Sequence, residues 1–224
     1  VKTQVQDAES IDFVVGPHDR SGWFDPQTVM DGLVFGDGSV HKASNNLIVL
    51  HIGENDKCYF NSEVKNKRKI PDRFKSFDKI YSFLRGLYSA NGSVADNRIT
   101  LKTSSVSVRE DLQLMLSSIG IRSYFTTNKA KMVDFENGSY ECKESYDVNI
   151  TTDRSIFMQK IGFIQQYKND KVQITKTSNR KNSADIISVE HISTEETFDI
   201  TVDNNSHTFW CNGFDTSNCV EINL

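Results

Sequence analysis

The sequence predicts an α/β (α+β) body followed by an all-β C-terminal segment. Up to about residue 168, stretches with helical spacing of apolar residues alternate with short strand-like stretches. From Ile186 onward only short alternating stretches remain, separated by turn formers such as Asn212-Gly213. The charge changes at the same place: residues 182–224 contain eight acidic residues and neither Lys nor Arg, in a chain of net charge −4.

The first elements of the body are bounded by recognisable signals. A helix is expected at 26–36, because Asp25 can act as N-cap and Pro26 fits the first helical position. A strand bounded by turn formers is expected at 46–53. Residues 55–66 are compatible with a second helix.

The second part of the body begins with a more strongly patterned helix. In residues 77–90 the apolar residues Ile80, Phe83, Leu84 and Leu87 recur at helical spacing. The remaining elements expected in the body are a strand at 98–103, a helix at 107–119, strands at 121–126 and 140–151, and a helix at 153–167.

Composition restricts the class of protein. With 37% hydrophobic and 25% charged residues among 224, the chain has the balance of a globular protein with a core. It has no apolar run of the roughly 18 residues that a membrane span needs, so no membrane partner is expected. The four cysteines are scattered, without a Cys-x-x-Cys pair, which is typical of a reduced, cytoplasmic protein.

Positive charge is clustered in spite of the negative total. Eight Lys and Arg residues lie between Lys65 and Arg85, against two Asp. A second cluster contains Lys160, Lys168, Lys171, Lys176, Arg180 and Lys181. Such local excess can attract phosphates. The alternative is that both clusters are merely solvated faces.

Two stretches of the body repeat each other without a gap. GLVFGDGSV at 32–40 and GLYSANGSV at 86–94 each end a predicted helix and precede a strand. Small residues four apart, Gly32 and Gly36 in one helix and Gly86 and Ala90 in the other, allow two helix backbones to approach closely. The repeat therefore predicts a pseudo-twofold pair of helices whose C-terminal ends meet, with Asp37 beside Asn91.

A carboxylate at a helix C-terminus faces the negative end of the dipole and is tolerated if a cation neutralises it. Asp37 with nearby carbonyl oxygens forms a set of hard ligands that suits Mg²⁺. Such a metal could activate water and stabilise phosphoryl charge during strand scission. The alternative is that Asp37-Gly38 and Asn91-Gly92 are only turns after helices.

These paired helix ends resemble the motifs of the LAGLIDADG homing endonucleases, most closely in FLRGLYSANGSV at 83–94. The resemblance implies a domain over 1–181 with αββαββα repeats at about 26–76 and 77–168, forming a saddle-shaped antiparallel sheet. It implies Mg²⁺-dependent cleavage of a double-stranded DNA homing site by a monomer, with Asp37 and Asn91 as catalytic metal-site residues. The basic side chains expected to contact DNA are Lys65, Lys67, Arg68, Lys69 and Arg73, and two further contacts are expected at positions 130 and 132, in the stretch NKAKM.

Two departures from that family pattern affect the expected activity. Asn91 stands where the second acidic residue belongs, so metal affinity should fall and cleavage should be reduced, strand-biased or lost. In the last case the domain would be a DNA-binding scaffold. Positions 37 and 91 are only 54 residues apart, which is too short for a full set of strands in the first repeat. Either the first repeat is shortened, or a segment near Lys65–Lys69 is missing from the given sequence.

The C-terminal segment, expected at 182–218, contains a second chemical motif. An asparagine side chain can attack its own carbonyl, and a following cysteine can act as a thiol nucleophile. With the preceding strands, Asn218-Cys219 resembles the C-terminal splicing block of an intein with a Hedgehog/intein (HINT) fold. The resemblance implies that His207 assists proton transfer and that Asp199 is a supporting acid. Ser217 replaces the usual penultimate histidine, so cyclisation would be slow or depend on His207.

The remaining partners follow from that resemblance. Residues 219–224, CVEINL, resemble the active-site strand of the ribonucleotide reductase large subunit, which would be the C-extein. The Thr-x-x-His block of an N-terminal intein half does not occur in the sequence, so that half, with its N-extein, is an expected partner. The competing interpretation is an ordinary two-domain interaction protein in which Asn218-Cys219 is accidental.

Overall fold

The structure is a computed structural model of the 224-residue chain. It describes residues 10–12, 23–40, 47–52, 56–61, 67–174, 183–194, 196, 200–202, 207–211 and 213–217.

The first part of the body is one helix followed by a three-stranded antiparallel sheet. Helix α1 (Pro26–Asp37) begins as predicted: the Asp25 carboxylate accepts from the Thr28 amide at 2.9 Å. Strands β2 (Ser39–Val40), β3 (Leu47–Ile52) and β4 (Asp56–Asn61) form a sheet of order β2-β3-β4. The helix predicted at 55–66 is therefore wrong, because the β-forming residues of that stretch pair with β3.

The second part of the body is longer. A 3₁₀ turn, η2 (Asp72–Phe74), precedes helix α2 (Ile80–Asn91). Next come β5 (Gly92–Ala95), β6 (Arg98–Thr103) and helix α3 (Val106–Ser118). The chain continues through β7 (Tyr124–Asn128), β8 (Lys131–Phe135), β9 (Gly138–Cys142), β10 (Ser145–Ile150) and the short helices α4 (Arg154–Lys160) and α5 (Gln166–Asp170).

Two predicted elements are divided in the structure. The strand expected at 140–151 is β9 and β10, and β9 pairs with β8 in a hairpin that the sequence analysis did not predict. The helix expected at 153–167 ends at Lys160, because Gly162 adopts a φ of +60° that leaves the helical path. A short α5 then starts after Gln165.

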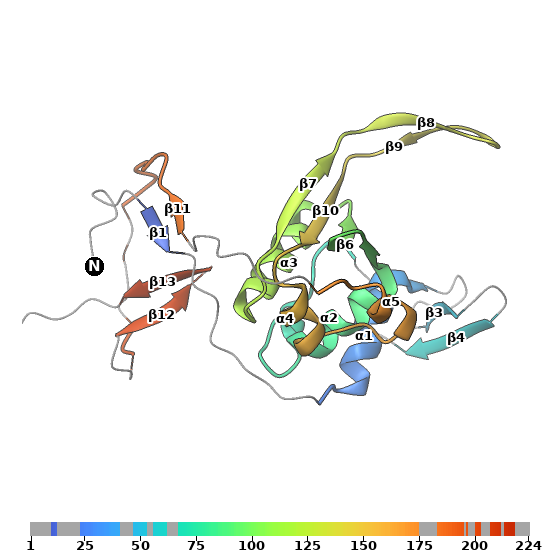
Figure 1. Ribbon diagram of the computed structural model, residues 1–224, viewed down its shortest axis with the longest axis horizontal. Helices are drawn as coiled ribbons and strands as arrows, with labels where there is room; N and C mark the ends of the chain where they lie inside the picture. Colours follow the sequence, from blue (N-terminus) through green and yellow to red (C-terminus); the bar gives the residue numbers. More distant parts are fainter. Residues whose placement is uncertain are drawn as a thin grey trace, which may run out of the picture.

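The main sheet is antiparallel with strand order β5-β6-β10-β7, and it has one apolar and one polar face. Ile99, Leu101, Val148 and Ile150 alternate on β6 and β10 and belong to the hydrophobic core. Helices α2 and α3 contact these strands and contribute Leu87, Leu112 and other buried side chains to the same core. Figure 1 shows that β7 and β10 run on into β8 and β9 as a long two-stranded ribbon beyond the helices.

The C-terminal segment contains two small pairings. Strand β1 (Ser10–Asp12) pairs antiparallel with β11 (Ser183–Asp185), so an early and a late segment of the chain lie together. Strands β12 (Thr208–Cys211) and β13 (Phe214–Ser217) form a hairpin. Within the part of the chain that the structure describes, every helix is too short or too polar to span a bilayer.

Candidate functional site

Helices α1 and α2 approach each other as closely as their glycines allow. A Cβ built on Gly32 would lie 2.8 Å from the amide nitrogen of Leu87, and one on Gly86 would lie 2.8 Å from that of Leu33. Real Cβ atoms essentially never come so close to backbone atoms. The glycine repeat therefore fixes the contact between these two helices, as the sequence predicted.

The C-terminal ends of the two helices meet, so the predicted proximity of positions 37 and 91 is confirmed. Asn91 Nδ2 donates to the Gly36 carbonyl oxygen at 3.0 Å, directly next to Asp37. Both Asp37 and Asn91 are exposed to solvent. One carboxylate and one amide thus share an accessible position where the two repeats join.

Lys67 reaches the same carbonyl group. Its Nζ donates to Gly36 O at 3.2 Å, although the residue lies 31 positions further along the chain. Partial desolvation lowers the pKa of Lys67 from its ordinary value, while attraction to the Asp37 carboxylate opposes that shift. The helix ends therefore bring together an anion, an amide and a cation.

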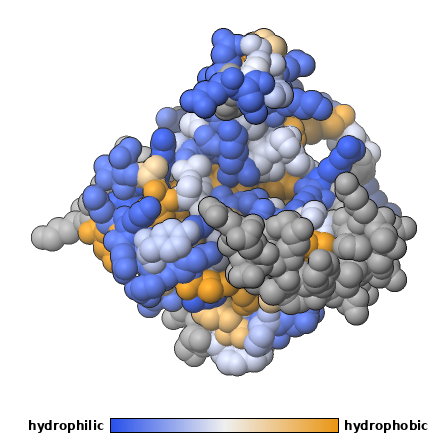
Figure 2. Space-filling model, turned by 90° about the vertical axis from the view of Figure 1, so that its right-hand side faces the viewer, coloured by the Kyte–Doolittle hydropathy of each residue, from blue (hydrophilic) through white to orange (hydrophobic). Residues whose placement is uncertain are grey.

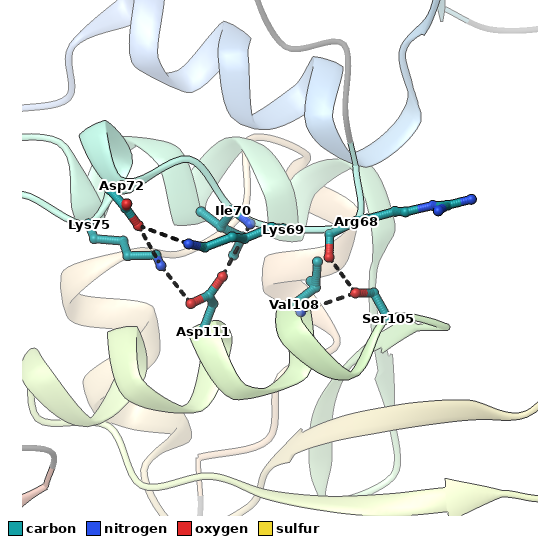
Figure 3. A network of polar contacts seen from close by, with 8 residues as sticks. All are labelled: Arg68, Lys69, Ile70, Asp72, Lys75, Ser105, Val108 and Asp111. Atoms are coloured by element: carbon teal, nitrogen blue, oxygen red, sulfur yellow. Dashed lines mark hydrogen bonds and ion pairs between the residues drawn. The ribbon is translucent and has the colours of Figure 1, made fainter.

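The segment that carries Lys67 is attached to helix α3 by a network of polar contacts (Figure 3). Ser105, the N-cap of α3, donates from Oγ to Arg68 O at 2.5 Å and accepts from Val108 N at 3.3 Å. The Asp111 carboxylate accepts from Ile70 N at 3.2 Å and from Lys75 Nζ at 2.6 Å. Burial disfavours the charge of Lys75, but its bonds to Asp111 and Asp72 outweigh this and raise its pKa.

The other basic residues predicted as DNA contacts before α2 are dispersed. The side chain of Arg68 points away from this network in Figure 3. Lys69 lies 3.8 Å from the exposed carboxylate of Asp72, and the Arg73 guanidinium lies 4.7 Å from the ring centroid of Phe74. Lys65 lies outside the described residues.

The DNA contacts expected at positions 130 and 132 are wrong by one residue. Those positions hold Ala130 and Met132, which are exposed but carry no charge and so cannot neutralise a phosphate. The lysines of this stretch are Lys129 and Lys131, exposed where β7 leads into β8. We therefore expect Lys129 and Lys131 to supply the positive charge at the base of the ribbon.

A polar sheet face adjoins the helix ends, and most of its residues were not predicted as functional. Because Gly92 begins β5 directly after Asn91, this face starts beside the meeting helices. Strand register places one set of alternate residues on it, all polar except Ala95: Ser93, Ala95, Arg98, Thr100, Lys102, Tyr124, Thr126, Asn128, Ser145, Asp147 and Asn149. The alternation of polar residues in RITLKT and SYDVNI was the available signal.

Three side chains on neighbouring strands of this face are joined by hydrogen bonds. The buried Asn149 accepts from Thr100 Oγ1 at 2.8 Å and donates from Nδ2 to Thr126 Oγ1 at 3.4 Å. Arg98 and Lys102 are exposed on the same face. In the side view of Figure 2, the ribbon forms the upper lobe and its surface is mainly hydrophilic.

The residues predicted for peptide chemistry are only partly described. The register of the β12–β13 hairpin places Thr208 opposite Ser217. His207 directly precedes Thr208, is exposed and has a φ of 51°, which is uncommon for a residue other than glycine. Asp199, Asn218 and Cys219 lie outside the described residues, as does the side chain of Ser217.

Comparison with known families gives one decisive match. Residues 78–198, slightly more than half of the chain, match the model of the LAGLIDADG-like domain. The chain belongs to the LAGLIDADG-like family. The match starts just before α2 and includes the whole of the main sheet and its ribbon.

Solved structures give weaker likenesses to this LAGLIDADG-like chain. A structure of mesophilic variants of the homing endonuclease I-DmoI is 17% identical, with 60% of this chain and 93% of that chain covered and a TM-score of 0.38. A crystal structure of I-DmoI in complex with DNA and Mn is 20% identical, with 60% and 94% covered and a TM-score of 0.34. With TM-scores this low, neither likeness establishes the arrangement of this chain.

The donor atoms at the helix ends fit a single hard cation. Among the described residues, no group of three or more His, Cys, Asp or Glu side chains is placed to hold a metal ion. Asp37 supplies one carboxylate, and the Asn91 amide and the Gly36 carbonyl can supply neutral oxygens. This set suits one weakly held Mg²⁺ or Mn²⁺ at Asp37, and not a symmetrical pair of carboxylate sites.

Proposed function

We propose that this chain binds double-stranded DNA and cleaves it at a specific homing site with the help of a divalent cation, Mg²⁺ in the cell. The observation that carries the proposal is the meeting of the two helix ends, which sets Asp37 and Asn91 beside a polar antiparallel sheet face. A duplex lying on that face would bring its backbone to the exposed carboxylate. A single chain contains both repeats, so we expect a monomer to bind one duplex.

In this mechanism the chain's residues position the DNA, and Asp37 holds the metal. Basic side chains on the sheet face and around it would neutralise phosphates. Those described by the structure are Arg98, Lys102, Lys67, Arg68, Lys69, Arg73, Lys129 and Lys131, and we propose that Lys65 acts with them. Side chains on neighbouring strands would read base edges in the major groove. A bound divalent cation would supply Lewis-acid stabilisation of phosphoryl charge and a more acidic water.

The amide at position 91 makes the site asymmetric. Asp37 carries a full negative charge, whereas Asn91 offers only a neutral oxygen and donates a hydrogen bond to Gly36 O. One strand of the duplex would therefore be cleaved faster than the other. We expect nicked circles to accumulate before linear product.

The test is incubation of the purified chain with Mg²⁺ or Mn²⁺ and a plasmid that carries the uninterrupted host gene. Site-specific nicking that disappears in Asp37→Ala supports the proposal, and Asn91→Asp should increase the linear product. Binding of that plasmid without scission, with and without Asn91→Asp, contradicts a nuclease function.

A second candidate has the same fold without catalysis. The hydrogen bonds from Asn91 and Lys67 to Gly36 O favour it, because they satisfy the helix end without a metal. In that case the body, over 1–181, is a DNA-binding scaffold that supports the C-terminal segment. The plasmid experiment separates the two, since this scaffold would bind the site and leave both strands intact.

We further propose that 182–218 is the C-terminal splicing segment of an intein, and that 219–224 begins a ribonucleotide reductase C-extein. Two observations support this proposal. The β12–β13 register brings His207 towards the strand end that leads into Asn218-Cys219, and the β1–β11 pairing joins segments on either side of the body. Asn218 would cyclise, Cys219 would be the nucleophile and Asp199 would support them, whereas Ser217, in place of the usual histidine, would leave cyclisation slow or dependent on His207.

Peptide release tests the splicing proposal. Intact-mass measurement after incubation with a thiol should show loss of the peptide Cys219–Leu224, and a chain carrying an N-terminal intein half should accelerate it. Asn218→Ala should abolish the release, and His207→Ala should slow it. No release with or without the N-terminal half would favour an ordinary interaction protein.

A further inference from the structure

We propose that Lys67 is a tethered cation that competes with the divalent metal ion for Asp37 in the DNA-free protein. This inference rests on the proposed function, because it concerns the metal site named there. It assigns to Lys67 a role in the DNA-free protein in addition to phosphate contact in the complex. In this role the ammonium group weakens metal binding until DNA is present.

The first observation is that the Gly36 carbonyl oxygen accepts two hydrogen bonds. Its oxygen accepts from Asn91 Nδ2 at 3.0 Å and from Lys67 Nζ at 3.2 Å. A carbonyl oxygen has two lone pairs, so these two donors occupy both of them. A cation that binds Asp37 and uses this carbonyl must first displace one of the donors.

The second observation is that the backbone next to Lys67 is held in place by hydrogen bonds to helix α3. Its neighbour Arg68 is held at its carbonyl by Ser105, and the amide of Ile70 is held by Asp111 (Figure 3). The Ile70 side chain is fully buried. Only the flexible lysine side chain can move, so its charge stays close to the helix ends.

The third observation is the charge balance. Asp37 and Lys67 cancel, and Asn91 is neutral, so these three side chains together carry no net charge. A divalent cation gains affinity mainly from negative charge, and a positive charge roughly 6 Å away costs it about threefold to tenfold in water-like surroundings. Lys69 and Arg73 make other contacts, with Asp72 and with the Phe74 ring.

The experiment is a Mn²⁺ titration of the full chain without DNA at low ionic strength, with free Mn²⁺ measured by electron paramagnetic resonance. Lys67→Met should tighten the site about threefold to tenfold relative to wild type. Lys67→Arg keeps the charge and should bind within about twofold of wild type. Arg68→Met is the matched control, because its side chain points away from the network, and it should change affinity less than Lys67→Met.

Asp37→Asn identifies the site and separates the two proposals. If Asp37→Asn removes a Mn²⁺ site that Lys67→Met leaves unchanged or weakens, the competition is wrong and the proposed metal site stands. If neither wild type nor Lys67→Met has an Asp37-dependent site, both proposals are wrong. If Lys67→Met weakens duplex binding in EDTA but leaves Mn²⁺ affinity unchanged, Lys67 is a phosphate contact alone and the competition is again wrong. Unfolding midpoints near wild type show that each variant is folded.

Discussion

The missing Cβ atoms of Gly32 and Gly86 determine how near the two central helices lie. Each glycine faces the backbone of the other helix, whereas Gly36 faces the Ala90 methyl group, 2.5 Å from where its own Cβ would be. Glycine in a helix costs about 1 kcal/mol relative to alanine, and close packing offsets this cost. The same packing brings position 37 to position 91.

Substitution at one of these glycines tests the packing. Gly86→Ala improves helix propensity but places a methyl group against the amide of Leu33, so the helices must separate. We expect the free energy of unfolding, measured with urea, to fall by about 1–3 kcal/mol. Glu110→Ala on the exposed face of α3 is the control and should change it by less than about 0.5 kcal/mol. Unchanged stability of Gly86→Ala would contradict the close approach of the two helices.

In the second repeat, the buried carboxylate of Asp153 holds two segments of the chain together. Asp153 is 1% exposed and accepts from the Arg122 amide at 2.8 Å, from Nε at 2.9 Å and from Nη2 at 3.0 Å. The side-chain hydrogen bond raises the pKa of Arg122. The pair joins the loop before β7 to the start of α4, and nothing in the local sequence pattern indicates it.

Asp153→Asn should therefore destabilise the chain much more than a comparable change at the surface. It removes the charge that the Arg122 guanidinium faces, and breaking such a buried pair costs about 3 kcal/mol. Asp72→Asn, in an ion pair whose carboxylate is 77% exposed, should cost less than about 1 kcal/mol. Urea unfolding of the two variants in parallel gives the comparison; equal losses would show that Asp153 is not specially placed.

At the scale of elements, the sequence predicts helices better than strands. Helices α1, α2 and α3 were predicted because caps and apolar spacing are local signals. Strand β4 was mistaken for a helix, and β8 was missed, because strand pairing depends on partners elsewhere in the chain. The polar sheet face was missed for the same reason: it exists only once β6, β7 and β10 are in register.

Among the side chains that the structure describes, none from β8 or β9 belongs to the hydrophobic core, so charges on the ribbon can be changed without unfolding the body. We expect Lys129→Gln with Lys131→Gln to reduce the slope of log affinity against log salt for duplex DNA by about 2, one for each phosphate that is no longer neutralised. The unfolding free energy should stay within about 0.5 kcal/mol of wild type. Lys171→Gln, on the C-terminal side of α5, is the single-charge control and should leave the slope unchanged. A slope unaltered by the double substitution would remove the ribbon lysines from the interface.

At the scale of the whole molecule, the two repeats are unequal. Within the described residues, the first gives one α-helix and a three-stranded sheet, whereas the second gives a four-stranded sheet, a ribbon and the four helices α2 to α5. The 54-residue spacing already predicted an incomplete set of strands in the first repeat. Position 37 was predictable from the repeat, but the presence of Lys67 beside it was not, because the contacts of 67–75 with α3 are long-range.

In the sequence, the body lies between strands β1 and β11, which pair with each other. The hydrophobic core runs from Val34 to Phe163, without a residue from β1, β11, β12 or β13 among those described.

A chain limited to residues 23–174 should therefore fold cooperatively and bind duplex DNA with the affinity and salt dependence of the full chain. It should release no C-terminal peptide, since Asn218 is absent. Circular dichroism, urea unfolding and duplex titration check these expectations against the full chain. Loss of cooperative unfolding in the shortened chain would mean that the terminal strands hold the body together, and the two proposed activities would then depend on one folding unit.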